Sequence, residues 1–403
     1  MRSARGNTVK YEELRRLRSE AYRVLDSQIV PFWCSMQDND NGGFYGDMDM
    51  ELELHREADK GCILQSRILW FFSELAALTG KDTHVKAADH AFRFLKEHCI
   101  DRRYGGVFWS VTYDGNPADT TKHTYAQAFA VYALSSYYAL TGSEPALDTA
   151  LQLFRLIETK CRDSSGYLES FDRCWSPSKN DKLSEKNVIA QRTMNTLLHV
   201  FEAYANLYRC HPNRDIADAM GEILRIFENN IYSHDKQRLE VFFDSSYHSL
   251  VDLQSYGHDI ETSWLLDEGC SLLEGSELAD RIYSIDKALA ESVYDRAFSD
   301  SSLLNECENG VNDTDRIWWV QSEAIVGFVN QWQKTKESRY LRAADEIFRY
   351  IQLHIADSRE GSEWLWGVHA DGSPMNGHGI VNEWKCPYHS GRMCLELIRR
   401  SGI

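Results

Sequence analysis

The stretch GCILQSRILWFFSELAALTGKDTHVKAADHAFRFLKE, at residues 61–97, combines two kinds of helix. Its first half is apolar almost all round, which is typical of a buried helix. After the turn LTGKD (78–82), apolar residues recur at i, i+3, i+4 and i+7 with charges between them. This spacing predicts an amphipathic helix with one solvated face. A buried helix joined by a short turn to a half-exposed helix is therefore the unit of the fold.

The same unit recurs along the chain. Further buried helices are predicted from Thr124, Thr193 and Trp318, and a further amphipathic helix from Tyr340. Segments rich in glycine and aromatic residues separate the helix pairs at intervals of roughly 60 to 70 residues. They alternate apolar and polar residues around turn formers, which predicts short β-hairpin loops. These segments are GGFYGDMD, YGGVFWSVTYDG, SGYLESFD, RLEVFFDS and EWLWGVHADG, with LLNECENG as a weaker match.

Six such repeats predict an all-α fold, an (α/α)6 barrel of about twelve helices with short β-hairpin loops at one end. One outer helix is expected near Tyr11 to Trp33. Because no linker divides the chain, we expect a single catalytic domain over residues 1–403, with about eight residues at the start as a flexible tail. Two helical domains are the alternative. Since all inner helices run the same way, their N-termini and the long loops should meet at the end that holds the site.

Composition narrows the class of function. The formal net charge of −17 disfavours nucleic acid and anionic membranes as partners. No apolar run is long enough to span a membrane, and the segment MRSARGNTVKYEELRR lacks the apolar core of a secretory signal. The ten cysteines have no metal-binding spacing, which predicts free thiols in a reducing, cytoplasmic location. The 11 tryptophans and 20 tyrosines favour a carbohydrate site or fill a large core.

Polar and aromatic residues recur near the start of each buried helix. Because an unpaired polar group is costly to bury, these positions indicate a site. In chain order the candidates are Arg67, His123, Tyr125, Asn195, His199, His258, Glu261, Trp318, Trp319, Glu323, Trp384 and His389. His123 is equally well explained as a structural residue, so it is left out of the predicted site.

Two of the histidines have a sequence context that suits acid-base chemistry. His258 and Glu261 are three residues apart, so the carboxylate can hold the imidazole in one tautomer, or the two can form a structural ion pair. His258 and His389 both lie near expected helix N-termini, and the positive end of a helix disfavours an imidazolium. We therefore expect both rings to be neutral and able to accept a proton.

Other chemistries fit the sequence less well. It contains no GxSxG elbow, phosphate-binding loop or dinucleotide fingerprint. A glycoside hydrolase that uses Glu261 and Glu323 as its two carboxylates is one alternative. A metal site built from His199, His258 and His389 would lack the usual HxH or HxxxH spacing, so no metal is expected. A sugar-binding protein without catalysis is a further alternative.

A family resemblance rests on six segments that occur in order from about Pro31 to Arg399, namely ADKGCILQSRILW, KHTYAQAFAVYALSSYY, MNTLLHVFEAY, YGHDIETSWLL, RIWWVQSEA and EWKCPYHSGRMCLE. Together they resemble the N-acylglucosamine 2-epimerase superfamily, and GHDIE and EWKCPYHSGRM are the specific parts. The resemblance implies an (α/α)6 barrel, no cofactor, and epimerisation through an enediolate. The implied reaction converts the reducing-end glucose of a β-1,4-linked disaccharide to mannose. A monosaccharide epimerase or an aldose-ketose isomerase of the same superfamily is the nearest alternative.

The resemblance also implies the partners and the site residues. The expected partner is a disaccharide substrate such as cellobiose, a cello-oligosaccharide or lactose, bound by a monomer. His389 would take the carbon 2 proton of the glucose-type substrate, His258 would return a proton to the opposite face, and His199 would assist ring opening or bind the first hydroxyl. Many relatives carry a second histidine where this chain has Leu197, so only His199 is carried over. The implied substrate contacts are Arg67, Tyr125, Asn195, Glu261, Trp318, Trp319, Glu323, Trp366 and Trp384, with Trp366 stacking on the second sugar.

Overall fold

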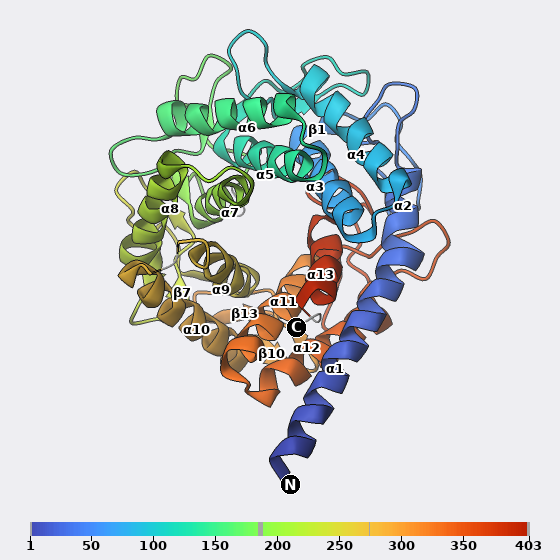
Figure 1. The fold of residues 1–403 in the computed structure, drawn as a ribbon, viewed down its shortest axis with the longest axis vertical. Coiled ribbons are helices and arrows are strands. Elements are labelled where there is room, and N and C mark those ends of the chain that lie inside the picture. Colours follow the sequence, from blue (N-terminus) through green and yellow to red (C-terminus); the bar gives the residue numbers. More distant parts are fainter. Residues whose placement is uncertain (1, 184–187, 274, 401–403) are drawn as a thin grey trace.

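The computed structural model describes residues 2–183, 188–273 and 275–400, and its helices form two concentric rings (Figure 1). The inner ring consists of α3 (Cys62–Thr79), α5 (Thr124–Thr141), α7 (Met194–Cys210), α9 (Tyr256–Cys270), α11 (Trp318–Thr335) and α13 (Pro387–Arg400). The outer ring consists of α1 (Arg2–Val24), α2 (Val30–Ser35), α4 (Asp82–Phe94), α6 (Glu144–Leu156), α8 (Arg214–Ile226), α10 (Glu277–Ala297) and α12 (Ser338–Tyr350). This arrangement is the predicted (α/α)6 barrel.

Burial follows the two kinds of helix that the sequence predicts. In α5, every residue from Thr124 to Tyr137 is buried, because the helix packs on the barrel interior and on its neighbours at once. In α12, by contrast, apolar residues such as Leu341 and Ile347 face the inner ring while the charged residues between them stay accessible. The turn after α5 is closed by Gly142 with a φ of 69°, a left-handed conformation that favours glycine.

Five of the outer segments continue into a single π-helical turn at the same point of the repeat. These turns are η1 (Leu25–Ile29), η2 (Leu95–Cys99), η3 (Ile157–Cys161), η4 (Phe227–Ile231) and η5 (Ile351–Ile355). A π-helical turn is rare and local, so its recurrence reflects the internal repeat. The helix α10 is longer and leads directly into a strand.

The loops pair mainly with the loops of the next unit, which the sequence did not predict. Strands that precede inner helices bind strands of the following loop in the pairs β1 (Lys60–Gly61) with β2 (Ser110–Val111), β3 (Lys122–His123) with β4 (Ser170–Phe171), β5 (Arg192–Thr193) with β8 (Phe242–Phe243), β9 (Leu253–Ser255) with β12 (Glu306–Glu308), and β14 (Arg316–Ile317) with β15 (Gly367–Val368). All of these pairs are antiparallel, and a bridge between Met48 and Val381 joins the first loop to the last.

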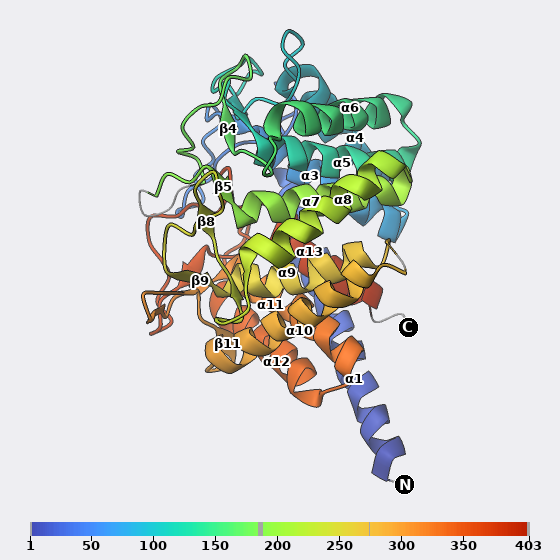
Figure 2. The ribbon, with the colours of Figure 1, turned by 90° about the vertical axis from the view of Figure 1, so that its left-hand side faces the viewer.

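Local hairpins are also present, in agreement with the prediction. They are β6 (Tyr232–Ser233) with β7 (Arg238–Leu239), β10 (Phe298–Ser299) with β11 (Ser302–Leu303), and β12 with β13 (Val311–Asp313). Figure 2 shows the strands β4, β5, β8, β9 and β11 with the long loops at one end of the barrel, and the short helix-helix turns at the other. The loop end is therefore where the inner helices begin.

Ion pairs of a buried lysine or arginine fasten the segments that lead into four of the inner helices. Lys60 Nζ lies 2.7 Å from Asp38 Oδ2, and neither side chain is exposed. The same position of later repeats carries the pairs Lys122–Asp101, Arg192–Asp163 and Lys385–Glu363, at 3.1, 2.6 and 2.7 Å. Each pair ties the start of an inner helix to the loop before it. A buried charge that loses its partner is strongly destabilising.

We expect Lys60→Met to lower the free energy of unfolding by about 3–5 kcal/mol, because it leaves the Asp38 carboxylate buried without its cation. Urea unfolding followed by circular dichroism measures this change. Lys86→Met is the matched control, since Lys86 forms an exposed pair with Asp82 at 2.8 Å, and such pairs contribute about 0–1 kcal/mol. Equal unfolding midpoints for the two variants would contradict the role of the buried pair.

The remaining expectations on the fold concern the ends of the chain and its thiols. The helix α1 begins at Arg2, so the backbone of the expected N-terminal tail is helical, and its mobility stays a prediction. The outer helix expected near Tyr11 to Trp33 is formed by α1, η1 and α2. The ten cysteines are free, as expected. Among the described residues, no helix combines the length and apolar character needed to cross a membrane.

Candidate active site

A cavity of about 410 Å³ opens at the loop end of the barrel, where the inner helices begin. It collects eleven of the twelve residues predicted for the site, namely Arg67, Tyr125, Asn195, His199, His258, Glu261, Trp318, Trp319, Trp366, Trp384 and His389. Glu323 does not line the cavity and lies behind His389. The wall is completed by Lys182, Leu183, Thr193, Val241, Phe242, Leu253, Ser255, Asn305, Glu306, Asp313, Asp315, Ile317, Met375 and His378.

Each inner helix contributes its sixth residue to one layer of the barrel interior. From α3 to α13 these residues are Arg67, Phe129, His199, Glu261, Glu323 and Arg392. Neighbours in the layer touch: the guanidinium of Arg67 lies 4.1 Å from the Phe129 ring centre, which lies 4.8 Å from that of His199. A second layer, about one helical turn closer to the loops, contains Tyr125, Asn195, His258, Trp319 and His389. The polar residues of the inner helices thus occupy two layers.

His389 is held in the first turn of α13. Its Nδ1 lies 2.7 Å from Glu323 Oε1, so its Nε2 is the ring nitrogen left for the substrate. Burial lowers the pKa of His389 well below its ordinary value, and the nearby charges of Arg392 and Arg67 act in the same direction. The ring is therefore neutral at neutral pH, as expected.

His258 is held in the first turn of α9, but not by the group that the sequence suggested. Its Nδ1 lies 2.7 Å from Ser255 Oγ, whereas Glu261 binds Arg392 instead. The expected pairing of His258 with Glu261 is wrong, because the Glu261 side chain turns toward the guanidinium on α13. Burial, more than the helix end, lowers the pKa of His258 to about 3, with His199 and His389 adding to the effect. The expectation of a neutral ring is confirmed with a different main cause.

The two imidazoles share one aromatic neighbour. The ring centre of Trp319 lies 4.7 Å from that of His258 and 5.5 Å from that of His389. The Trp319 ring also packs against Gly257, where a Cβ would come within 2.5 Å of the ring. A glycine before His258 therefore allows the tryptophan to sit between the two helix starts.

His199 lies one turn deeper, on α7. Its Nδ1 lies 2.8 Å from Glu202 Oε2, and its ring packs against Phe129 and Tyr125. Burial lowers the pKa of His199, although the bond to Glu202 opposes the shift. The arrangement again leaves Nε2 as the free ring nitrogen.

Arg67 brings a fixed positive charge to the cavity. Its Nη2 donates to the Tyr125 hydroxyl at 2.8 Å and its Nη1 donates to the Trp384 carbonyl at 3.3 Å. The guanidinium packs over the rings of Phe129 and Tyr388. Its Nε has no hydrogen-bond partner within the described part of the chain. A buried cation with unused donor capacity is suited to an anionic oxygen.

Tryptophan residues line the cavity wall at two places. The ring centres of Trp318 and Trp366 are 4.4 Å apart, and Trp366 stacks on His378 with ring centres 4.5 Å apart. Trp384 lies against Tyr125 with ring centres 6.0 Å apart. Aromatic faces of this kind can pack against the apolar faces of sugar rings.

Carboxylates at the cavity wall and behind it pair with a single cation. Arg392 Nη2 forms ion pairs with Glu261 and, at 2.8 Å, with Glu323. Burial and the neighbouring Glu323 raise the pKa of Glu261 to about 8, despite Arg392. Glu261, Glu323 and His389 have the mutual spacing of metal ligands. The guanidinium, however, already supplies the positive charge, so these residues do not fit a metal centre.

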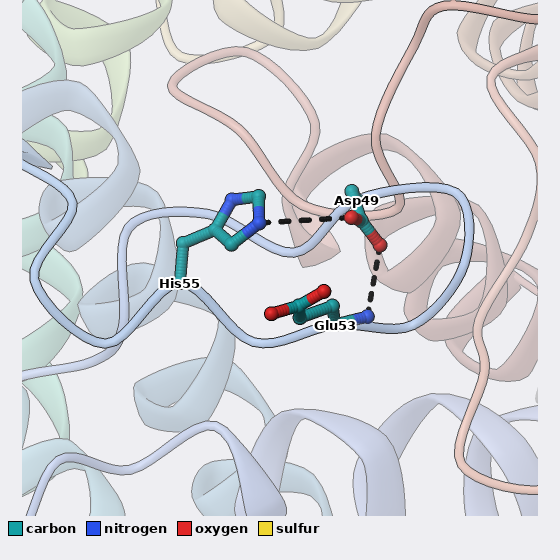
Figure 3. Close-up of side chains that lie close together, drawn as sticks. All are labelled: Asp49, Glu53 and His55. Carbon is teal, nitrogen blue, oxygen red and sulfur yellow. Dashed lines mark hydrogen bonds and ion pairs between the residues drawn. The ribbon is translucent and has the colours of Figure 1, made fainter.

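A second group with metal-ligand spacing lies in the first loop and consists of Asp49, Glu53 and His55 (Figure 3). The His55 ring contacts two carboxylates, with Nδ1 2.6 Å from Asp47 and Nε2 3.6 Å from Asp49. The hydrogen bond to Asp47 raises the pKa of His55, which favours the imidazolium over a metal ligand. This group is therefore interpreted as a cluster of ion pairs at the surface.

Several residues that support the site were missed from the sequence. Arg392 and Glu202 lie in quoted motifs, but charged residues inside amphipathic or apolar helices look like surface residues when the structure is unknown. Ser255 precedes α9 and had no distinguishing pattern. His123, which was left out of the predicted site, is buried, with its Nε2 3.2 Å from Asn180 Oδ1. Asn195 lines the cavity, and its Oδ1 has no partner in the described residues.

Comparison with known proteins places the chain in a family. The family model for N-acylglucosamine 2-epimerase matches residues 43–389. A cellobiose 2-epimerase from Eubacterium cellulosolvens is 47% identical, over 95% of this chain and 98% of that protein, and one from Ruminococcus albus is 44% identical over the same shares. The structure of cellobiose 2-epimerase from Bacillus thermoamylovorans is 42% identical, with a TM-score of 0.93, over 96% of this chain and 100% of that one. An α-mannanase at 11% identity, with a TM-score of 0.62, shares the fold alone.

Proposed function

The chain belongs to the N-acylglucosamine 2-epimerase family of carbohydrate epimerases, and we propose that it converts the reducing-end glucose of cellobiose to mannose without a cofactor. The observation that carries this proposal is a pair of neutral imidazoles, His258 and His389, placed against Trp319 in one cavity beside Arg67. Relatives named as cellobiose 2-epimerases at 41–47% identity support the disaccharide substrate. The whole chain acts as one catalytic domain and as a monomer in this proposal.

The first chemical step is removal of a proton from carbon 2. In the open-chain sugar this carbon lies next to the carbonyl, so loss of its proton gives an enediolate rather than a localised carbanion. His389 accepts the proton at Nε2, since Nδ1 is engaged with Glu323. A neutral imidazole is suited to this role. His199 lies deeper, with its own Nε2 free, and assists ring opening or binds the first hydroxyl.

The second step returns a proton to the other face of carbon 2. His258 belongs to α9 and His389 to α13, so the two bases approach the sugar from different helices. Once the negative enediolate has formed, His258 takes up a proton from water and transfers it to carbon 2, while His389 releases to water the proton that it accepted. Ser255 Oγ can either donate to or accept from His258 Nδ1, so this ring can change its protonation state while it keeps its position.

Charge that develops on the substrate oxygens needs a fixed partner. Arg67, braced by Tyr125 and by the Trp384 carbonyl, supplies that charge from the deeper layer. Asn195 adds an amide oxygen that can accept a hydrogen bond from a substrate hydroxyl, since it has no partner in the described residues. Groups that are already in place when the charge forms stabilise the transition state more effectively than water does.

The second sugar is proposed to lie on the platform of Trp318 and Trp366. Both rings line the cavity, and the loop that carries Trp366 binds α11 through the bond from Trp318 N to Trp366 O at 3.0 Å. A cavity of about 410 Å³ gives room beyond the reacting ring. Cello-oligosaccharides and lactose, which share the β-1,4 linkage, are proposed as further substrates.

Proton NMR of cellobiose incubated with the protein in deuterated water tests the function. We expect a new mannose-type anomeric signal and deuterium at carbon 2 of the reducing sugar, with no cofactor added. Activity on mannose or N-acetylmannosamine, without any on cellobiose, would favour the monosaccharide alternative. Free glucose as the product, with activity that depends on Glu261 and Glu323, would indicate a hydrolase. Binding without exchange of the carbon 2 hydrogen would indicate a sugar-binding protein.

A further inference from the structure

Arg392 lies behind the cavity and contacts the carboxylates that orient two of the site histidines. Its Nη1 lies 2.6 Å from Glu202 Oε1, and the other oxygen of Glu202 lies 2.8 Å from His199 Nδ1. Its Nη2 lies 2.8 Å from Glu323 Oε1, the same oxygen that lies 2.7 Å from His389 Nδ1. One guanidinium thus connects the chain His199–Glu202–Arg392–Glu323–His389 across α7, α11 and α13.

This arginine is not exposed to the substrate. It is 1% exposed and does not line the large cavity; instead it lines a smaller one, of about 50 Å³, toward the opposite end of the barrel. Its flat group packs over the rings of Tyr388 and Trp264, with centres 4.1 and 4.8 Å away. Since it cannot touch the sugar, any effect on the reaction passes through the carboxylates that it binds.

The charge of Glu323 decides which nitrogen of His389 can act as the base. An ionised carboxylate only accepts, so it requires a proton on His389 Nδ1 and leaves Nε2 bare. A protonated Glu323 can donate to Nδ1, which then carries no hydrogen, and the neutral ring carries its proton on Nε2 instead. In that tautomer the nitrogen that faces the substrate cannot accept the carbon 2 proton.

We propose that Arg392 is a positioning residue that keeps Glu323 ionised, so that His389 presents a bare Nε2 to the substrate. The proposal rests on the proposed function, in which His389 is the base. It stands on the shared contact of the guanidinium and the imidazole with one oxygen of a buried carboxylate.

The electrostatic surroundings of Glu323 support this role. Burial holds the pKa of Glu323 above its ordinary value, and the charge and the hydrogen bond of Arg392 are the strongest influences that lower it. Arg392 has the same influence on Glu202, the carboxylate that binds His199. Although burial opposes the shift, Arg392 and His199 lower the pKa of Glu202 to about 2. The remaining charged or titratable groups around Glu323 and His389 come from α3, α7, α9 and α13 and are Arg67, His199, His258, Glu261 and Tyr388. Among these, Arg67 is the other permanent cation, and it lies on the substrate side.

Arg392→Met tests the proposal through the pH profile. Without the guanidinium the Glu323 carboxyl holds its proton to higher pH, so we expect kcat at pH 7 to fall by about 100-fold with KM within about threefold. As the pH rises toward 9, Glu323 ionises and part of kcat should return. Arg392→Lys keeps the charge and should stay within about tenfold of the natural protein at pH 7. Arg399→Met is the matched control, since this arginine of α13 is partly exposed and binds Glu74.

Two results would overturn the proposal in the folded variant: a pH profile with the same shape as that of the natural protein, or a loss that appears in KM alone. Circular dichroism and the thermal midpoint establish whether the variant is folded.

A second measurement needs neither substrate nor a variant of Arg392. Nitrogen-15 NMR of histidine-labelled protein distinguishes protonated from bare ring nitrogens, and His389→Gln identifies the signals of His389. We expect Nδ1 protonated and Nε2 bare in the natural protein. The opposite tautomer would overturn the proposal even if Arg392→Met failed to fold. Because no sugar is present, this result is separate from the test of the epimerase function itself.

Discussion

His389→Ala should lower kcat for cellobiose epimerisation by about 1000-fold or more. A positioned acid or base contributes about 10²–10⁴-fold, and His389 is the ring whose Nε2 is free beside Trp319 while Nδ1 is fixed by Glu323. Among the residues that line the cavity, His389 is the one contributed by α13. Epimer formation measured by chromatography at saturating cellobiose gives the effect. Because Glu323 keeps Arg392 as a partner, the thermal midpoint should change by only about 4 °C or less.

The matched control for this variant is His354→Ala. His354 lies on η5 at the outer surface and packs only on the ring of Tyr350 among the described aromatic contacts. It should keep full activity, which separates loss of the base from loss of any histidine. Retention of more than a few per cent of epimerase activity in His389→Ala would remove this residue from the role of base.

The architecture could be predicted because the burial of a helix determines how apolar and charged residues are spaced along its sequence. An inner helix such as α5 contacts neighbours on all sides and therefore has no polar face, whereas α12 shows charges at fixed intervals. The inner-ring bounds follow from this contrast, and the helix starts at Thr124 and Trp318 agree with the prediction. The pairing of successive loops could not be predicted, because two-residue strands carry almost no periodic pattern.

The sequence predicted which residues line the site, but not which side chains bind one another there. Polar residues at the starts of inner helices mark the cavity, so His258 and Glu261 were both found. Their spacing along one helix suggested a pair, yet Glu261 turns to Arg392 on a different helix and Ser255 holds His258. Side-chain partners across the barrel depend on rotamers and on helix rotation, which sequence spacing within one helix does not report.

Arg392 is a second residue whose role could not be predicted from the sequence. It occupies the sixth position of its helix, as Arg67 and Glu323 do in theirs, but it precedes the charged end of α13 with Arg399 and Arg400. In such a helix an arginine looks solvated. Only the three-dimensional position shows that it is buried among carboxylates that face inward from other helices.

The two proposed bases can be distinguished because each acts on a different face of carbon 2. His258→Ala should abolish epimer formation from cellobiose, with a fall of at least about 100-fold, yet His389 should still exchange the carbon 2 hydrogen of the glucose-type sugar. In deuterated water the His389 imidazolium exchanges with solvent and returns deuterium to the face from which it took the proton. Proton NMR should show deuterium at carbon 2 of cellobiose without a mannose-type signal.

The internal control uses the epimeric disaccharide, 4-O-β-glucosylmannose, as the starting sugar. Its carbon 2 hydrogen points to the opposite face, so removing it needs the base that His258→Ala lacks, and no exchange is expected. His389→Ala should show the mirror result, with exchange from the mannose-type sugar alone. Exchange of both sugars by one variant would mean that a single base reaches both faces. Since His258 and His389 begin different helices and meet only across Trp319, the geometry favours one base for each face.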